Sequence, residues 1–217
     1  MTLTTTELRI PLADVELDAD LRLPDRARGV VVFAHGSGSS RRSRRNLHVA
    51  GRLHAERFGT LLFDLLTREE QIVDERTREW RFDIPLLARR LGGVGRWLAA
   101  RPGTPAWRAY FGASTGAAAA LVAAAADPSI VHAVISRGGR PDLAGDSLPQ
   151  VRAPTLLIVG GEDDVVIGLN EAALRELDCP KELVIVPGAT HLFEEPGTLD
   201  AVCDHVVRWL DRHCPAG

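Results

Sequence analysis

The sequence predicts a three-layered α/β domain with a mostly parallel sheet, and two observations carry this prediction. Short apolar runs rich in β-branched residues alternate with longer amphipathic stretches, which is the pattern of parallel strands joined by helices. The later apolar runs contain almost no polar residues, as expected of strands that are covered on both faces. The 217 residues are expected to form a single domain, 1–217, because no repeat or linker interrupts the alternation.

The first two expected strands differ from the later ones, because polar and apolar residues alternate along them. Residues 7–12 and 15–23 are therefore expected to form an antiparallel hairpin at a sheet edge. Six further strands are predicted at residues 29–34, 60–64, 107–111, 132–136, 155–159 and 182–186. Helices are predicted at residues 44–58, 78–100, 115–126, 167–177 and 198–213.

Two connections lie where an open α/β sheet binds ligands, at the carboxyl ends of strands. Residues 65–78 carry many charges and are expected to form a solvated loop. The connection 136–155 is too short to hold a helical lid. The ligand-binding edge is therefore expected to be open.

Composition argues against several classes of function. The net charge of −3 gives no reason to expect nucleic acid or a membrane surface as the main partner. The first residues lack the basic and apolar regions of a secretory signal, and no apolar run is long enough to span a bilayer. Cys179, Cys203 and Cys214 lack metal-ligand spacing and are expected to be reduced thiols in a cytoplasmic protein. No metal or cofactor is expected, since no metal, dinucleotide or Walker-type motif occurs.

The most informative motif is GASTG at residues 112–116, which joins a predicted strand to an alanine-rich predicted helix. A serine at the tip of such a turn presents its hydroxyl to a ligand, and the flanking glycines let strand and helix pass closely. Serine is a weak nucleophile unless a base lies within hydrogen-bond reach and a third group orients that base. Ser114 is therefore the candidate nucleophile, and its partners should follow later strands.

His191 and Asp163 are the candidate partners. His191 follows the last predicted strand in a Pro-Gly loop, where a partly exposed base can lie. Asp163 follows the strand at 155–159 in a glycine turn and is the preferred group for orienting the imidazole. The alternatives are Asp164, Glu162, Asp142 and Asp146.

Two backbone N–H groups are expected to hold the oxyanion that forms when an ester carbonyl is attacked. The Thr115 amide, at the helix start after the nucleophile, is the first candidate. The second is the Ser37 amide, in the HGSGSS loop at 35–40, where small residues allow close backbone approach. His35 is interpreted as a brace for this loop. Four histidines on predicted helices are expected at the surface: His48, His54, His205 and His213.

Arginines gather near the predicted mouth of the site. Arg137 and Arg140 follow a strand's carboxyl end and are candidate substrate-binding residues. Four more surround the start of the predicted helix 44–58: Arg41, Arg42, Arg44 and Arg45. They form either a solvated rim with internal salt bridges or an electropositive entrance that favours esters and lactones bearing a carboxylate.

Segments spread over nearly the whole chain resemble the small, lidless, dienelactone-hydrolase-like branch of the α/β-hydrolases. These are HGSGSS at 35–40, RN at 45–46, FDLLT at 63–67, RFDI at 81–84, GASTG at 112–116, SRGGRPDL at 136–143, GGED at 160–163 and GATHLF at 188–193. The resemblance implies an α/β-hydrolase fold, an eight-stranded sheet whose second strand is antiparallel, no lid domain, and a Ser114–His191–Asp163 triad. Members that open dienelactone typically carry a cysteine at the position of Ser114, so ordinary ester hydrolysis fits this chain better.

The expected function is that of a cytoplasmic serine hydrolase that cleaves small carboxylic esters or lactones through an acyl-enzyme. A thioesterase or acyltransferase would use the same groups. A non-catalytic ligand-binding protein could share the fold, but it would have no need of the serine, histidine and acid together.

Overall fold

The computed structural model describes residues 2–215, and all the predicted strands and helices are present. The strands are β1 (Leu3–Pro11), β2 (Glu16–Pro24), β3 (Gly29–Ala34), β4 (Phe58–Phe63), β5 (Arg108–Ala113), β6 (Ala133–Arg137), β7 (Thr155–Gly160) and β8 (Lys181–Val186). The helices are α1 (Arg44–Ala55), α2 (Arg68–Thr77), α3 (Ile84–Ala100), α4 (Thr115–Ala126), α5 (Asp164–Glu176) and α6 (Thr198–His213), with a 3₁₀ helix η1 (Pro141–Gln150). No helix within residues 2–215 is both long and apolar enough to cross a membrane.

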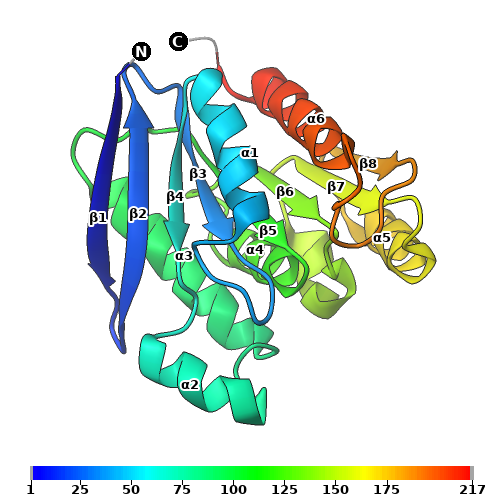
Figure 1. Cartoon of the computed structure of the whole chain (residues 1–217), viewed down its shortest axis with the longest axis horizontal. Helices are drawn as coiled ribbons and strands as arrows, with labels where there is room; N and C mark the ends of the chain where they lie inside the picture. Colours follow the sequence, from blue (N-terminus) through cyan, green and yellow to red (C-terminus); the bar gives the residue numbers. More distant parts are fainter. Residues whose placement is uncertain (1, 216–217) are drawn as a thin grey trace.

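The strands form one sheet in the order β1-β2-β4-β3-β5-β6-β7-β8 (Figure 1). Strand β2 pairs antiparallel with β1 and β4, and the other neighbours are parallel. The expected edge hairpin and the antiparallel second strand are both confirmed. The open, mostly parallel sheet without a lid domain is the α/β-hydrolase architecture.

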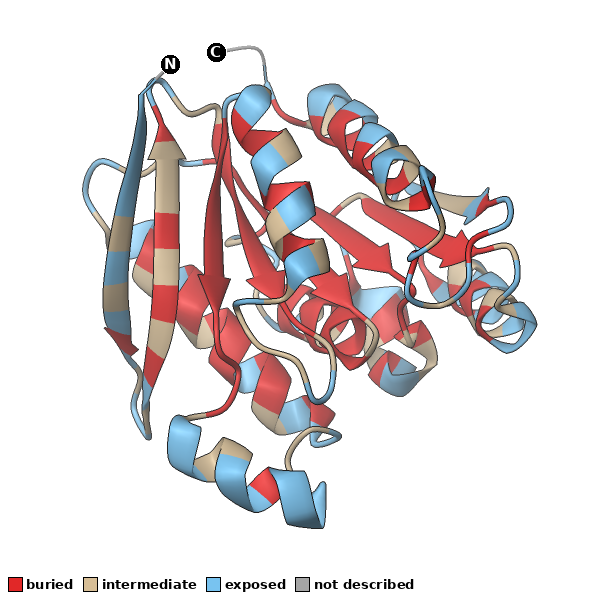
Figure 2. Cartoon of the chain, viewed as in Figure 1, coloured by how far each residue is buried: buried red, intermediate tan, exposed pale blue. Residues whose placement is uncertain are grey.

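The two faces of the sheet are covered by different helices. Helices α1 and α6 pack on one face, while α3, α4 and α5 pack on the other (Figure 1). Every residue of β3, β4, β5, β6 and β7 is buried, which explains their nearly unbroken apolar sequences (Figure 2). Two separate cores result, one on each side of the sheet.

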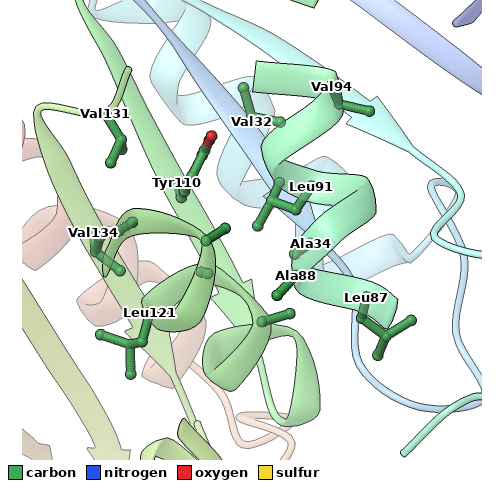
Figure 3. Packing of buried hydrophobic residues seen from close by; sticks show 14 of the residues in the cluster. Val32, Ala34, Leu87, Ala88, Leu91, Val94, Tyr110, Leu121, Val131 and Val134 are labelled. Carbon is green, nitrogen blue, oxygen red and sulfur yellow. The ribbon is translucent and has the colours of Figure 1, made fainter. Parts of the chain in front are cut away.

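Helix α4 lies at the centre of the second layer, and its alanines allow neighbouring elements to pack closely. Leu87 and Leu91 of α3, Leu121 of α4 and Tyr110 of β5 belong to this core (Figure 3). A Cβ at Gly95 of α3 would lie 2.1 Å from the Tyr110 hydroxyl oxygen, so only glycine fits there without movement. Because α4 follows the GASTG turn directly, the packing of α4 in this core fixes the position of that turn.

The prediction of a solvated loop at 65–78 was wrong, because Arg68–Thr77 form helix α2. The Thr67 side chain accepts from the Glu70 N–H, and the Glu70 carboxylate accepts from the Thr67 N–H. This reciprocal capping box stabilises the helix start, and its Thr-x-x-Glu pattern is visible in the sequence. Most of α2 is exposed in Figure 2, so its charges mark a solvated helix face. The helix expected at 78–100 accordingly begins only at Ile84, after the cap residue Asp83.

His54 was expected at the surface but is buried, with only 7% of its surface exposed. It lies on the inner face of α1, beside Ala50 and Leu53, and its Nε2 is 2.8 Å from Oγ1 of Thr60 on β4. This hydrogen bond lets a polar ring occupy a position of the helix that faces the sheet.

Candidate active site

Ser114 forms the turn between β5 and α4, at the carboxyl edge of the sheet. Its backbone has φ 51° and ψ −121°, a conformation that residues other than glycine rarely adopt. Such strain persists only where the surrounding structure holds it, and it clusters at active sites. The Ser114 N–H donates to the Arg137 carbonyl at 3.3 Å, and the Arg140 N–H donates to the Ser114 carbonyl at 3.2 Å. The loop after β6 therefore holds the turn in place.

Close backbone packing around Ser114 requires its neighbouring glycines. A Cβ at Gly116 would lie 2.3 Å from the Ala34 carbonyl oxygen, which would be a severe clash. A Cβ at Gly36 would lie 3.2 Å from Cβ of Ser114. The loop 35–40 therefore passes directly beside the serine.

His191 and Asp163 are hydrogen-bonded to each other. Nδ1 of His191 lies 2.7 Å from Oδ2 of Asp163. Because an ionised carboxylate only accepts hydrogen bonds, Nδ1 carries the proton, and Nε2 of the neutral ring is the unprotonated nitrogen. Asp164 is the exposed first residue of α5 and is not the partner of His191.

The loop that carries His191 is held from two sides. The Glu162 N–H donates to the Ala189 carbonyl at 2.9 Å, which ties the loop of the acid to the loop of the histidine. On the other side, the Thr190 hydroxyl donates to Oε1 of Glu195 at 2.6 Å. These bonds limit the movement of the imidazole relative to the carboxylate.

Both expected oxyanion donors lie next to Ser114. Thr115 is the first residue of α4, so its N–H has no acceptor within the helix. Ser37 lies in the loop after β3, whose neighbour Gly36 packs against Ser114. Both residues line hollows beside the serine.

His35 braces this loop, as the sequence analysis expected. Its Nδ1 lies 2.9 Å from the Gly36 carbonyl oxygen, and its Nε2 accepts from the Leu65 N–H at 3.1 Å. Burial lowers the pKa of His35, which keeps the ring neutral. With both nitrogens engaged, the ring has none free for proton transfer.

Two hollows flank the loop 35–40. The first, which we term the histidine pocket, has a volume of about 230 Å³. Its walls include Ser114, His191, Arg137, Arg45, Asn46 and Ser43. The second, the α2 pocket, is lined by Leu65, Leu66, Leu87, Arg81 and Thr115. Ser37 lies between the two and lines both.

Arg137 is the unusual residue of the histidine pocket. It is 7% exposed, and its Nε and Nη1 are buried without a hydrogen-bond partner among residues 2–215. Burial, with a smaller contribution from the positive charge of Arg45, lowers the pKa of Arg137 to about 10. The guanidinium therefore remains charged at neutral pH, although buried charges are normally paired.

Three other arginines near the mouth, Arg41, Arg45 and Arg140, are paired with carboxylates. Arg140 donates two hydrogen bonds to Asp142, at 2.8 and 2.7 Å, and is not a wall residue of the histidine pocket. Arg41 pairs with Asp64. Of the two candidate substrate-binding arginines, the structure thus places Arg137 beside Ser114 and Arg140 outside the pocket.

Two further polar residues support the site, of which Asn46 was named from the sequence only within the RN segment at 45–46 and Asn170 was not singled out. Asn46 of α1 is 1% exposed and lines the histidine pocket. Asn170 of α5 donates through Nδ2 to the Gly139 carbonyl at 3.0 Å and so supports the loop after β6. In both cases the available signal is a polar residue on the buried face of an amphipathic helix. Within the described residues, no group of three or more histidines, cysteines or carboxylates is placed to hold a metal ion.

Comparison with known proteins agrees with this architecture. The profile of the Dienelactone hydrolase family matches residues 17–207. The crystal structure of a dienelactone hydrolase from Anabaena variabilis is 52% identical, with a TM-score of 0.96 over 98% of this chain and 99% of that one. A Xanthomonas campestris protein described as an α/β serine hydrolase without lid is 20% identical, with a TM-score of 0.76 over 98% of this chain and 96% of that one, which shows the fold alone.

A protein of Mycobacterium tuberculosis with the provisional name phosphoribosyl transferase is 56% identical over 214 residues. The match covers 97% of this chain and 47% of that protein. The chain therefore spans about half the length of this curated relative, whose name describes the longer protein.

Proposed function

Because the chain belongs to the dienelactone hydrolase family, we propose that it is a serine hydrolase that cleaves small carboxylic esters or lactones through an acyl-enzyme. The observation that carries the proposal is the hydrogen-bonded pair of His191 and Asp163, which shares one edge of the sheet with the strained Ser114. This is the set of groups that nucleophilic catalysis by serine requires.

In the proposed reaction, Ser114 Oγ attacks the ester carbonyl while Nε2 of His191 accepts the hydroxyl proton. The amides of Ser37 and Thr115 hold the negative oxygen of the tetrahedral intermediate. His191 then returns the proton to the leaving alcohol. A water molecule, activated by the same histidine, cleaves the acyl-enzyme and releases the acid. Asp163 keeps the proton on Nδ1 and stabilises the imidazolium that forms twice in each cycle.

Arg137 is the residue that we propose binds an acidic group of the substrate, because its buried charge lacks a partner in the described part of the chain. Arg140 is less suited to this role, since Asp142 already neutralises it. We place the reaction in the cytoplasm, where the three buried free thiols Cys179, Cys203 and Cys214 would stay reduced.

A thioesterase or an acyltransferase would use the same groups. The side chain of His191 is 38% exposed, so water can reach the base, which favours hydrolysis as the fate of the acyl-enzyme. Product analysis with p-nitrophenyl acetate, in the presence and absence of an added alcohol, separates hydrolysis from acyl transfer.

The decisive experiment compares the wild type with Ser114→Ala. The wild type should react covalently with a fluorophosphonate and should turn over p-nitrophenyl acetate. Ser114→Ala should lose the label and several orders of magnitude in turnover, leaving roughly 10³-fold acceleration over water at most. Unchanged turnover in Ser114→Ala would overturn the proposed nucleophile.

A second experiment compares two adjacent aspartates. Asp163→Asn should lower turnover by about 10⁴, because an amide at this position can stabilise the wrong imidazole tautomer. Asp164→Asn is the matched control, since Asp164 is exposed and not bonded to His191. Greater damage from Asp164→Asn would show that the acid has been assigned one residue too early.

A further inference from the structure

We propose that the histidine pocket binds a phosphate group carried by the leaving alcohol of the substrate, and that Arg137 is the residue that holds it. This inference rests on the proposed serine hydrolase function and adds the chemical class of the substrate. The substrate would be an acyl ester of a phosphorylated alcohol. Hydrolysis would break the acyl–oxygen bond, add water to the acyl group and release the alcohol with its phosphate intact.

The first argument is the unbalanced charge of the pocket. No carboxylate among residues 2–215 lies within salt-bridge distance of the Arg137 guanidinium, whose Nε and Nη1 are also without hydrogen bonds. Among charged side chains, the one that most affects its pKa is another cation, Arg45. A buried cation is costly unless an anion pairs with it. The pocket therefore needs an anion from outside the protein.

The second argument is the N-terminus of helix α1, which lies at the same pocket. Helix α1 has twelve residues, begins after the cap residue Ser43, and has no acidic residue in its first turn. The free N–H groups and the dipole of a helix start favour an anion. Ser43, Arg45 and Asn46 all line the pocket. The start of α1 and the guanidinium of Arg137 thus face one space.

The number of donors favours phosphate over carboxylate. Arg137 lines the pocket, and a guanidinium carries five N–H donors, of which those on Nε and Nη1 meet no acceptor among residues 2–215. Arg45 adds a buried, unpartnered Nε, while its Nη1 is held on the outer side by Glu194 at 2.9 Å. The hydroxyls of Ser39 and Ser43 also line the pocket. A phosphate monoester presents three terminal oxygens to such a set, and a carboxylate presents two.

The position of His191 assigns the pocket to the leaving alcohol. In the proposed reaction this histidine gives its proton to the leaving oxygen, so the leaving group must lie on the same side as the imidazole. His191 lines the histidine pocket, whereas Leu65, Leu66 and Leu87 line the α2 pocket. The α2 pocket, whose walls also include Asp74, Glu75 and Arg81, then takes the acyl group. An acidic group reaches Arg137 only from the alcohol side of the ester.

The test keeps the acyl group constant and changes the alcohol. Acetate release is measured from 2-acetoxyethyl phosphate, 3-acetoxypropionate and propyl acetate. In the wild type, kcat/KM for the phosphate ester should exceed that for propyl acetate by roughly 10- to 100-fold, as a charge-assisted hydrogen bond allows. In Arg137→Met this ratio should collapse toward one, and in Arg137→Gln it should fall similarly.

Two controls separate the pocket from general charge effects. Arg44→Met removes a positive charge from the exposed start of the same helix, outside the pocket, and should keep the wild-type ratio. Methyl 3-(phosphonooxy)propanoate carries its phosphate on the acyl side and should gain nothing from Arg137. An equal preference for that ester, or a ratio that survives in both Arg137 variants, would overturn the proposal. A carboxylate ester that outperforms the phosphate ester would also overturn it.

A binding measurement makes failure of this inference distinguishable from failure of the proposed function. Inorganic phosphate should raise the melting temperature of the wild type and of Ser114→Ala, since ligand binding to the folded state stabilises it. It should not do so for Arg137→Met or Arg137→Gln. If no ester is cleaved but phosphate still stabilises through Arg137, the reaction is wrong and the site stands. If esters are cleaved but phosphate stabilises all variants equally, the site is wrong.

Discussion

Arg90 and Arg137 are buried on opposite faces of the sheet, and only Arg90 is paired with a carboxylate. Arg90 of α3 is 2% exposed, and its two terminal nitrogens meet the two carboxylate oxygens of Glu70 at 2.6 and 2.7 Å. Arg137, on the face covered by α1 and α6, is 7% exposed and has no such partner in the described chain. Burial alone therefore does not reveal what an arginine does. Its pairing does, because an unpaired buried charge is costly and persists only for a reason.

Further buried polar groups also differ between the two faces, since one is a paired charge and the other a neutral ring. Beside Arg90, Asp74 of α2 accepts from the backbone N–H of Trp80 and from Nε of Arg81, at 2.8 and 2.6 Å. These paired charges attach α2 and the segment after it to the rest of the molecule. On the opposite face, the buried His54 is held neutral: burial, followed by the nearby charge of Arg22, lowers its pKa to about 4.

The largest effect should come from breaking the Arg90 pair. Glu70→Gln keeps the shape of the side chain but leaves the guanidinium without a counter-charge. Loss of one partner of a buried pair lowers the free energy of unfolding by about 3 kcal/mol. In a chain of this size that should lower Tm by roughly 10 °C. Glu69→Gln, on the exposed side of the same helix turn, is the control and should change little. A Tm unchanged in Glu70→Gln would mean that Arg90 needs its partner no more than Arg137 does.

A smaller, pH-dependent effect should come from His54. Its folded pKa of about 4 lies below the ordinary value of 6.5, so between these values the unfolded chain binds more protons than the folded one. Stability is therefore lost as pH falls from 6.5 toward 4. Near pH 4, the free energy of unfolding of His54→Gln should therefore have fallen by about 2 kcal/mol less than that of the wild type. Urea unfolding across this pH range measures the difference.

Arg44→Gln provides the control for this measurement, since it changes an exposed residue of the same helix without touching an imidazole and should keep the wild-type slope. Identical slopes in the wild type and in His54→Gln would show that His54 does not titrate in this window.

The smallest effect should have the opposite sign. Arg137→Met removes a buried charge that no group among residues 2–215 balances, so the free energy of unfolding should stay constant or rise by about 1 kcal/mol. Thermal melts in a buffer free of phosphate measure this change. A loss of several kcal/mol would place Arg137 with Arg90 as a structural residue and would remove the contrast between the two faces.

Much of the fold and the central part of the candidate site were predictable because they depend on local patterns. Gly29–Ala34, Thr115–Ala126 and Thr198–His213 have the predicted limits, since the first two are uninterrupted small or apolar runs and the third has a clear helical period. The GASTG motif located Ser114 because a strand-to-helix turn needs small residues around its tip. Helix α2 was missed because its ten residues carry too few apolar side chains to show a helical period.

Choosing among neighbouring polar residues was harder. Asp163 and Asp164 are adjacent in the sequence, and only the turn geometry decides which one meets Nδ1 of His191. Arg137 and Arg140 are three residues apart, but Arg140 turns to Asp142 while Arg137 remains in the pocket. Likewise, nothing local indicated that Glu70 would pair with Arg90, twenty residues away.

The sequence by itself determined the alternation of strands and helices, the edge hairpin and the position of the GASTG turn, because hydrophobic period and glycine placement act over a few residues. Only the tertiary structure decided which charges are neutralised. Electrostatic pairing depends on distances between side chains that are remote in the sequence, and on how far the packed helices exclude water from each of them. That is why Arg90 and Arg137 look alike in the sequence and differ so much in the folded protein.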